Sequence, residues 1–141
     1  MRGVTLLELA IVLVIAGFVL AGAMRPLARV LDHFAVDGAA REVTTLIATA
    51  RHTAVTQRRR ARLRLQTDTL AIDTLGRSDW GRFHAWPGPA ARDIDMRASN
   101  SEVTFSPSGV AWGVSNTTIV FTRGSHVETV IVSRLGRVRR G

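Results

Sequence analysis

One carboxylate, Glu8, lies inside a long run of apolar residues near the start of the chain. The run extends from Val4 to Met24 and reads VTLLELAIVLVIAGFVLAGAM. A carboxylate inside a bilayer costs about 2.5–3.5 kcal/mol on insertion scales, and the cost is smaller near the end of a span. Glu8 is therefore the first functional candidate of this sequence.

Arginines form two clusters that could bind anions. The first cluster straddles a predicted helix–strand junction and is expected to be a solvated face; it contains Arg58, Arg59, Arg60, Arg62 and Arg64. The second cluster lies at the end of the sequence and contains Arg134, Arg137, Arg139 and Arg140. Because side chains alternate along a strand, Arg137 and Arg139 are expected to share one face. Two guanidinium groups on one face can hold successive phosphates.

The remaining reactive residue types do not form a catalytic pattern. The 4 histidines are scattered singly, without the spacing of zinc ligands. Ser106 and Ser108 flank Pro107 without the context of a nucleophile elbow. The chain has 0 Cys, which excludes disulfides and thiolate metal sites. We expect no enzyme activity, no metal and no cofactor.

Length and charge describe a small, strongly basic protein. The 141 residues suit one domain with one core and a terminal extension. The 19 basic residues are all Arg and stand against 11 acidic residues, which gives a net charge of +8. Such a field favours nucleic acid, anionic lipid or an acidic protein partner.

Residues 4–25 are predicted to form a transmembrane helix. A helix from Val4 to Met24 is about 30 Å long, which matches the hydrocarbon core of a bilayer. A secretory signal peptide is the alternative, with Ala21-Gly22-Ala23 as its cleavage site.

Beyond the apolar run, the period of the pattern predicts a helix and then strands. Residues 26–60 are predicted to continue the helix and to pack on a globular body, with a kink or break at Asp37-Gly38. Gly22 and Pro26 are further candidate bend points. From Ala61 the apolar period is two, which predicts antiparallel strands over residues 61–141. Residues 76–100 are expected to be a loop with one strand at most. The fold class is α+β, a long N-terminal hydrophobic helix followed by an antiparallel β domain.

The stretch Gly3-Val4-Thr5-Leu6-Leu7-Glu8-Leu9 resembles the processing motif of type IV prepilins and type II secretion pseudopilins. The resemblance implies that residues 1–3 are a leader, which a prepilin peptidase removes after Gly3 before methylating the amine of Val4. The family usually has Phe where this chain has Val4. Glu8 would then be the fifth mature residue and would neutralise the amine of a neighbouring subunit. A single-pass anchor with an accidental Glu8 is the alternative.

The C-terminal half resembles the GspH/FimT family of minor pseudopilins and minor pilins. The resemblance rests on Phe105-Ser106-Pro107-Ser108-Gly109, Thr118-Ile119-Val120-Phe121, Val130-Ile131-Val132 and Gly136-Arg137-Val138. It implies a pilin-like fold, other pilins or pseudopilins as partners, an anchor in the bacterial inner membrane and a periplasmic β domain. The protein would assemble into a type II secretion pseudopilus or a type IV pilus.

DNA binding is a second function that this resemblance suggests. FimT-type members that bind DNA during natural transformation carry a C-terminal Gly-Arg-x-Arg motif, and Gly136-Arg137-Val138-Arg139 fits it. Secretion-type members often end in a similar Gly-Arg turn, so the motif leaves both readings open. Arg134, Arg137, Arg139 and Arg140 are the candidate DNA-binding residues.

Overall fold

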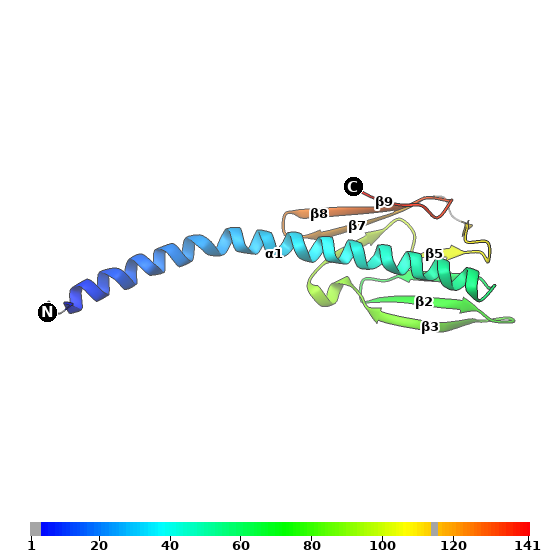
Figure 1. The fold of residues 1–141 in the computed structure, drawn as a ribbon, viewed down its shortest axis with the longest axis horizontal. Helices are drawn as coiled ribbons and strands as arrows, with labels where there is room; N and C mark the ends of the chain where they lie inside the picture. The colour runs from blue at the N-terminus through cyan, green and yellow to red at the C-terminus, as the bar shows by residue number, and fades with distance from the viewer. Residues whose placement is uncertain (1–3, 114–115) are drawn as a thin grey trace.

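A single long helix begins the fold and an antiparallel β domain follows it (Figure 1). The computed structural model describes residues 4–113 and 116–141, and the side chains of residues 23–26 are outside this description. Helix α1 (Leu6–Thr56) has 51 residues. Thr5 caps its start, and Thr5 Oγ1 accepts a hydrogen bond from the Glu8 N–H at 3.3 Å. The predicted α+β class is confirmed.

Helix α1 is continuous from Leu6 to Thr56, so the expected break at Asp37-Gly38 is wrong. The helix curves gently toward its N-terminal end, and it remains helical through Gly22 and Pro26 (Figure 1). Around Gly38 the helix gains support from its neighbours, because Val36, Ala39 and Ala40 are buried in the core. Tertiary packing of this kind overrides the weak helix propensity of a single glycine.

Helix α1 ends four residues before the expected boundary at residue 60. Gln57 is its C-cap, and Arg58 follows with a φ of 51°. This left-handed conformation commonly ends a helix and is usually adopted by glycine. The next strand then begins at the residue where the apolar period changes to two, Ala61.

Two antiparallel sheets form the β domain. Sheet A has the order β3-β2-β1-β5-β6, with bounds β1 (Ala61–Leu65), β2 (Thr69–Leu75), β3 (Trp80–Pro87), β5 (Glu102–Phe105) and β6 (Ala111–Trp112). Sheet B has the order β4-β7-β8-β9, with bounds β4 (Asp95–Ala98), β7 (Thr117–Arg123), β8 (His126–Val132) and β9 (Val138–Arg140). The expectation of a loop over residues 76–100 is wrong, because this segment contains β3, the short 3-10 helix η1 (Pro89–Arg92) and β4.

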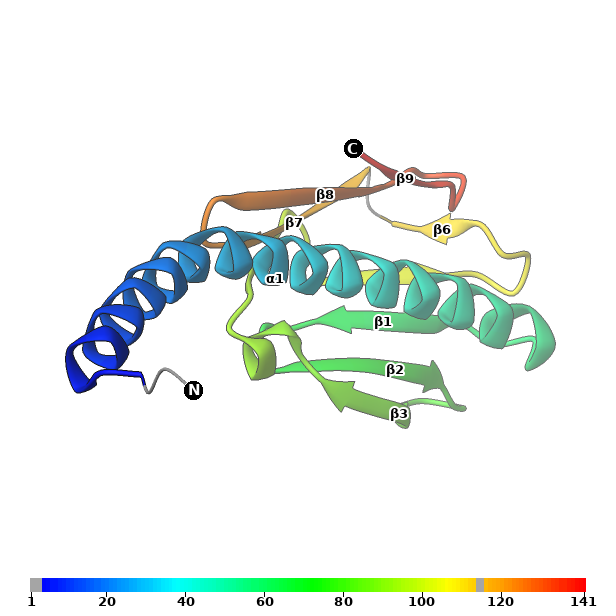
Figure 2. The same ribbon diagram turned by 60° about the vertical axis from the view of Figure 1, so that its left-hand side comes forward.

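The C-terminal half of α1 covers the faces of both sheets and forms the core with them (Figure 2). Its buried face is built mainly from alanine and β-branched residues at helical spacing, which lets the helix approach the sheets closely. The largest fully buried side chains from the sheets are Leu63, Leu70, Ile72, Phe105, Ile119, Phe121, Val130 and Val132. The predicted alternation of Ala61, Leu63 and Leu65 is confirmed, since all three are buried.

The molecule has two ends, and four features meet at the end opposite the N-terminus. The end of α1, the β2–β3 turn, the β5–β6 turn and the β8–β9 turn all lie there (Figure 1). We call this the distal end. These four segments are therefore all attached to the same core.

Candidate functional site

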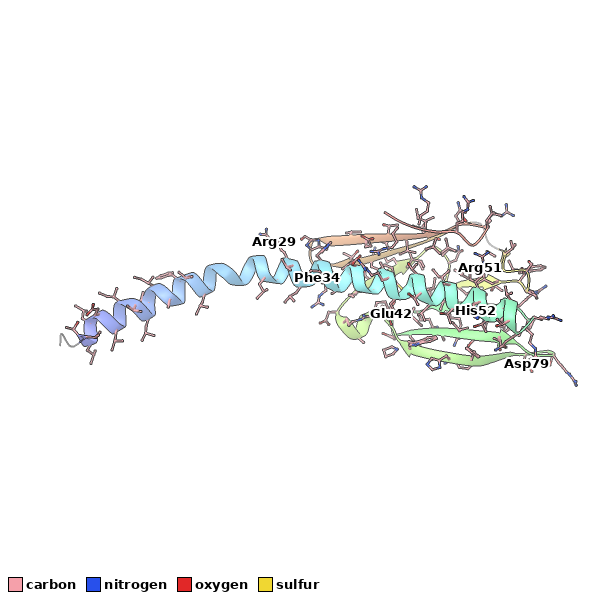
Figure 3. The ribbon with its side chains drawn as sticks, in the orientation of Figure 1. Arg29, Phe34, Glu42, Arg51, His52 and Asp79 are labelled. Carbon is pink, nitrogen blue, oxygen red and sulfur yellow. The ribbon has the colours of Figure 1, made fainter. Side chains whose placement is uncertain are left out.

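The N-terminal half of α1 is exposed and apolar over a length that can cross a membrane. The described chain contains 1 helix of this kind, with a mean hydropathy of 2.6 over its most apolar 18-residue window, and none of that window is buried. Exposed apolar side chains continue past the predicted membrane boundary to Leu27, Val30, Leu31 and Phe34. Arg29 lies on the bare stretch of the helix, whereas Phe34 lies where the helix has reached the edge of sheet B (Figure 3).

Glu8 lies in the first turn of α1, on its fully exposed part. It is three residues after the N-cap Thr5, so Thr5-Leu6-Leu7-Glu8 has the form of a capping box. This local role of Glu8 was not expected, although the Thr-x-x-Glu spacing is the sequence signal for it. A carboxylate in the first turn also interacts favourably with the positive end of the helix dipole. The predicted leader, residues 1–3 including Gly3, lies outside the described residues, whereas Val4 is described and is exposed.

Three of the four C-terminal arginines share one surface. Arg134, Arg137 and Arg139 line a shallow hollow on the outer side of sheet B, with Asn116, Ile131, Ser133 and Leu135 completing its wall. Arg139 lies opposite Ile131 in the β8–β9 ladder, and Arg137 lies in the turn before β9. These three side chains form no ion pair within the described part of the chain. They are therefore available to an anionic ligand.

Gly136 shapes the turn that presents these arginines. Its φ is 73°, and an added Cβ would lie 3.3 Å from the Phe105 ring. The turn is closed by hydrogen bonds from the Ser133 N–H to the Arg137 carbonyl at 2.8 Å and from the Gly136 N–H to the Ser133 carbonyl at 2.8 Å. The turn therefore requires glycine at position 136 for its backbone conformation, whether or not a ligand binds the neighbouring arginines.

Arg140 does not belong to this surface, which corrects its grouping with the other three. Its guanidinium forms ion pairs with Asp37 of α1 and with Glu128 of β8, the latter at 3.1 Å. The hydrogen bond from Arg140, together with the charges of Arg140 and Arg41 and partly opposed by desolvation, lowers the pKa of Asp37 below its ordinary value. We call Asp37, Glu128 and Arg140 the C-terminal clasp, because it fastens the last strand to the helix.

The first arginine cluster is also divided by the structure. Arg62, Arg64 and Arg82 surround Asp73, which is only 3% exposed, at 3.2, 3.1 and 3.0 Å. The expectation of a solvated face is therefore wrong for Arg62 and Arg64. Arg58 and Arg59, by contrast, are exposed, as expected.

Across the described residues, no group of three or more metal-ligating side chains is found. An exposed apolar helix of membrane length, continuous with an α+β head, defines a pilin-like subunit. Two comparisons of sequence agree with this class. The family described as Type II transport protein GspH matches residues 39–136 of this chain. A pilin-like protein of Thermus thermophilus, PilA1, is 34% identical over an alignment of 155 positions, which covers 98% of this chain and 97% of that protein.

Solved structures share the fold. The type IV minor pilin FimU of Pseudomonas aeruginosa superposes with a TM-score of 0.63 at 19% identity, over 74% of this chain and 86% of that one. The minor pseudopilin EpsH from the type 2 secretion system of Vibrio cholerae superposes with a TM-score of 0.61 at 11% identity, over 74% of this chain and 94% of that one. The chain belongs to the GspH family. Its relatives are structural components of pili and pseudopili, and the expectation that the chain is not an enzyme agrees with this.

Proposed function

We propose that this protein is a minor pilin or pseudopilin that assembles through α1 into a type II secretion pseudopilus or a type IV pilus. Before assembly, residues 4–25 anchor it in the bacterial inner membrane with the β domain in the periplasm. The observation that carries the proposal is the unburied apolar half of α1 with Glu8 near its start. Such a surface needs lipid or other helices around it.

Glu8 has the assembly role in this proposal. After removal of residues 1–3, Val4 would carry a positive amine, and Glu8 of a neighbouring subunit would pair with it. A buried carboxylate paired with a buried cation costs far less than either charge alone. The protein would thus bind the prepilin peptidase first, during removal of residues 1–3, and other pilins or pseudopilins afterwards, during assembly.

Replacing the carboxylate separates assembly from insertion. Glu8→Ala removes a cost of membrane insertion that is at most about 2.5–3.5 kcal/mol, so the membrane pool should be retained. Incorporation into sheared filaments should fall at least tenfold. Intact-mass analysis of the membrane pool should show loss of Met1–Gly3 and a methylated Val4 in both proteins. Normal amounts of Glu8→Ala in filaments would contradict the assembly role, and a mature chain starting at Met24 would indicate ordinary signal cleavage instead.

DNA binding by a subunit for DNA uptake is the second candidate function. The observation that favours it is the hollow where Arg134, Arg137 and Arg139 lie together without ion pairs. Guanidinium groups on a strand and a turn can bind phosphates, but they lack a groove-reading element, so binding should show no sequence preference.

A comparison at constant net charge tests this candidate. In a soluble fragment starting near Leu27, Arg137→Ala with Arg139→Ala should weaken duplex DNA binding more than Arg58→Ala with Arg59→Ala does. Each phosphate contact removed should lower the salt slope by roughly one unit. Equal losses in both pairs would leave only diffuse attraction, and no binding by the parent fragment at moderate salt would exclude DNA as a ligand.

A further inference from the structure

The distal end carries an exposed patch of apolar and arginine side chains that neither Glu8 nor the C-terminal arginines explain. Its apolar members are Val55, Val110 and Trp112, which are 46%, 43% and 52% exposed. Four arginines accompany them at the end of α1 and just beyond it: Arg51, Arg58, Arg59 and Arg60. Of these, Arg51 and Arg60 contact the β5–β6 hairpin. We call these seven residues the distal patch.

Close contacts hold the distal patch together. Gly109, in the β5–β6 turn, has a φ of 78°, and an added Cβ would lie 3.2 Å from Arg51 Nε and 3.2 Å from a Val55 methyl group. The guanidinium of Arg60 lies 3.8 Å from the centre of the Trp112 ring. The end of α1 and the β5–β6 hairpin thus form one continuous surface. Figure 3 shows Arg51 and His52 on this part of α1.

A groove lies beside the distal patch. It runs beside Arg51 and Val55 and separates the end of α1 from the β8–β9 turn; its other lining residues are Ile47, Ala48, His52, Gly136 and Val138. The lining is mostly apolar, so the groove suits an apolar side chain of a partner protein. The surrounding arginines would orient that partner by pairing with its acidic side chains.

Ending the helix does not account for these arginines. In the part of the chain that the structure describes, the side chains of Arg51, Arg58, Arg59 and Arg60 take no part in a hydrogen bond or ion pair. Arg58 also occupies a left-handed position that glycine would fill with less strain. A positive charge at this strained position, without a partner in the described chain, is free to pair with a negative group outside it.

The composition of the patch favours a protein partner with acidic side chains. Trp and Arg around an apolar centre are the residues that dominate protein–protein interfaces. Four uncompensated positive charges require negative charge on the facing surface. A second copy of this chain offers no acidic cluster to this patch. Seven of its acidic residues form internal ion pairs: Asp32, Asp37, Glu42, Asp73, Asp95, Glu102 and Glu128. In the described β domain, the acidic residues outside these pairs are Asp68, Asp79 and Asp93, which lie singly in three different turns.

We propose that the distal patch docks on an acidic surface of a different subunit of the same filament, and not on a second copy of this chain. The proposal rests on the filament function above. Pairing between unlike subunits would then be set by charge at the distal end, while the apolar helices supply the common packing.

Site-specific photo-crosslinking in the native host tests this docking. The full-length chain carries p-benzoylphenylalanine at Val110, inside the patch, or at Val127, which is 60% exposed on the outer face of sheet B. We expect the Val110 probe to crosslink to a different subunit at a segment rich in Asp and Glu. Arg58→Glu with Arg59→Glu should lower that yield at least fivefold. Arg58→Lys with Arg59→Lys should keep it within twofold, and resistance of each variant to protease should confirm its fold.

Several results would overturn the docking proposal alone. These are a crosslink from Val110 to a second copy or to nucleic acid, an unchanged yield in the glutamate pair, or no crosslink from wild-type protein that is present in sheared filaments. Equal yields to the same subunit from Val110 and Val127 would also contradict a site confined to the distal end. Absence of the wild-type chain from sheared filaments would instead overturn the proposed function, and the docking with it.

Discussion

Asp73 shows how one buried side chain organises its part of the fold. It is 3% exposed, accepts hydrogen bonds from Arg62 of β1 and Arg82 of β3, and forms a further ion pair with Arg64 of β1. Arg62 also pairs with Glu102 of β5 at 3.2 Å and stacks on Trp80 at 4.4 Å. Four of the five strands of sheet A are therefore joined through this carboxylate and its partners. Removing one partner of a buried ion pair is costly, because the charges that remain lose their compensation.

Asp73→Asn should destabilise the β domain by about 3 kcal/mol, the low end for a broken buried ion pair, because the arginines keep part of their hydration. Asp95→Asn is the matched control, since its pair with Arg97 is largely exposed and should contribute less than about 1 kcal/mol. Thermal unfolding of both variants, followed by circular dichroism, measures the difference. Equal destabilisation of the two variants would mean that burial of the Asp73 ion pairs does not increase their contribution to the free energy of unfolding.

At the scale of elements, the unbroken course of α1 past Gly38 is the main departure from expectation. Asp37 pairs with Arg41 at 2.9 Å, one turn further along the helix. A Cβ added at Gly38 would meet no atom within 4 Å, so the backbone there does not need glycine. Gly38 therefore lowers the helix propensity of this part of α1 without being required by the backbone or by packing.

Gly38→Ala should stabilise the protein by about 0.8–1 kcal/mol, because alanine loses less backbone freedom in a helix interior. The midpoint of chemical denaturation measures this gain. Gly136→Ala is the opposing control: its φ of 73° and the nearby Phe105 ring predict a loss of about 1 kcal/mol or more. No gain from Gly38→Ala would indicate that the helix is locally open at this position.

The strands that the sequence predicted well are the ones with a buried face. In β1, Leu63 alternates with arginines, and in β2, Ile72 lies in a short apolar run. Both patterns are typical of strands with a buried face. Strand β3 was missed because it is an edge strand with almost every residue exposed, which leaves no apolar period to detect. Strand alternation predicts that Arg137 and Arg139 share one face, and both line the hollow, although Arg137 lies in the turn before β9. The position of Arg140 could not be predicted in this way, because its partner Asp37 is 103 residues away in sequence.

At the scale of the whole molecule, the C-terminal clasp joins the two ends of the globular part of the chain. Asp37 belongs to the first turns of α1 that reach the core, and Arg140 is the penultimate residue of the chain. Gly141 continues the ladder through two hydrogen bonds with Thr129, at 3.1 and 3.0 Å. The last strand is therefore held by both side-chain charge and backbone pairing.

The C-terminal clasp should make stability depend on acid pH. The pKa of Asp37 lies below its ordinary value of 3.8 in the folded protein, so its stabilising effect is complete above that value and is lost as pH falls through the folded pKa. The difference in Tm between wild type and Asp37→Asn should be constant from pH 7 to about 5 and should shrink below pH 3.8. Asp68→Asn, at an exposed residue outside the clasp, should show no such convergence.

The continuity of α1 has a mechanical consequence. A helix of 51 residues is a rod roughly 77 Å long, and only its second half is gripped by the sheets. Tension applied at the membrane end would be transmitted along this continuous helix into the core, although Pro26 has no N–H to donate and leaves one hydrogen bond of the helix unmade. A subunit drawn out of a bilayer by its β domain would thus be pulled through the contacts that join α1 to sheet B, beginning with the Asp32–Arg123 ion pair and the packing of Val36 and Ala40.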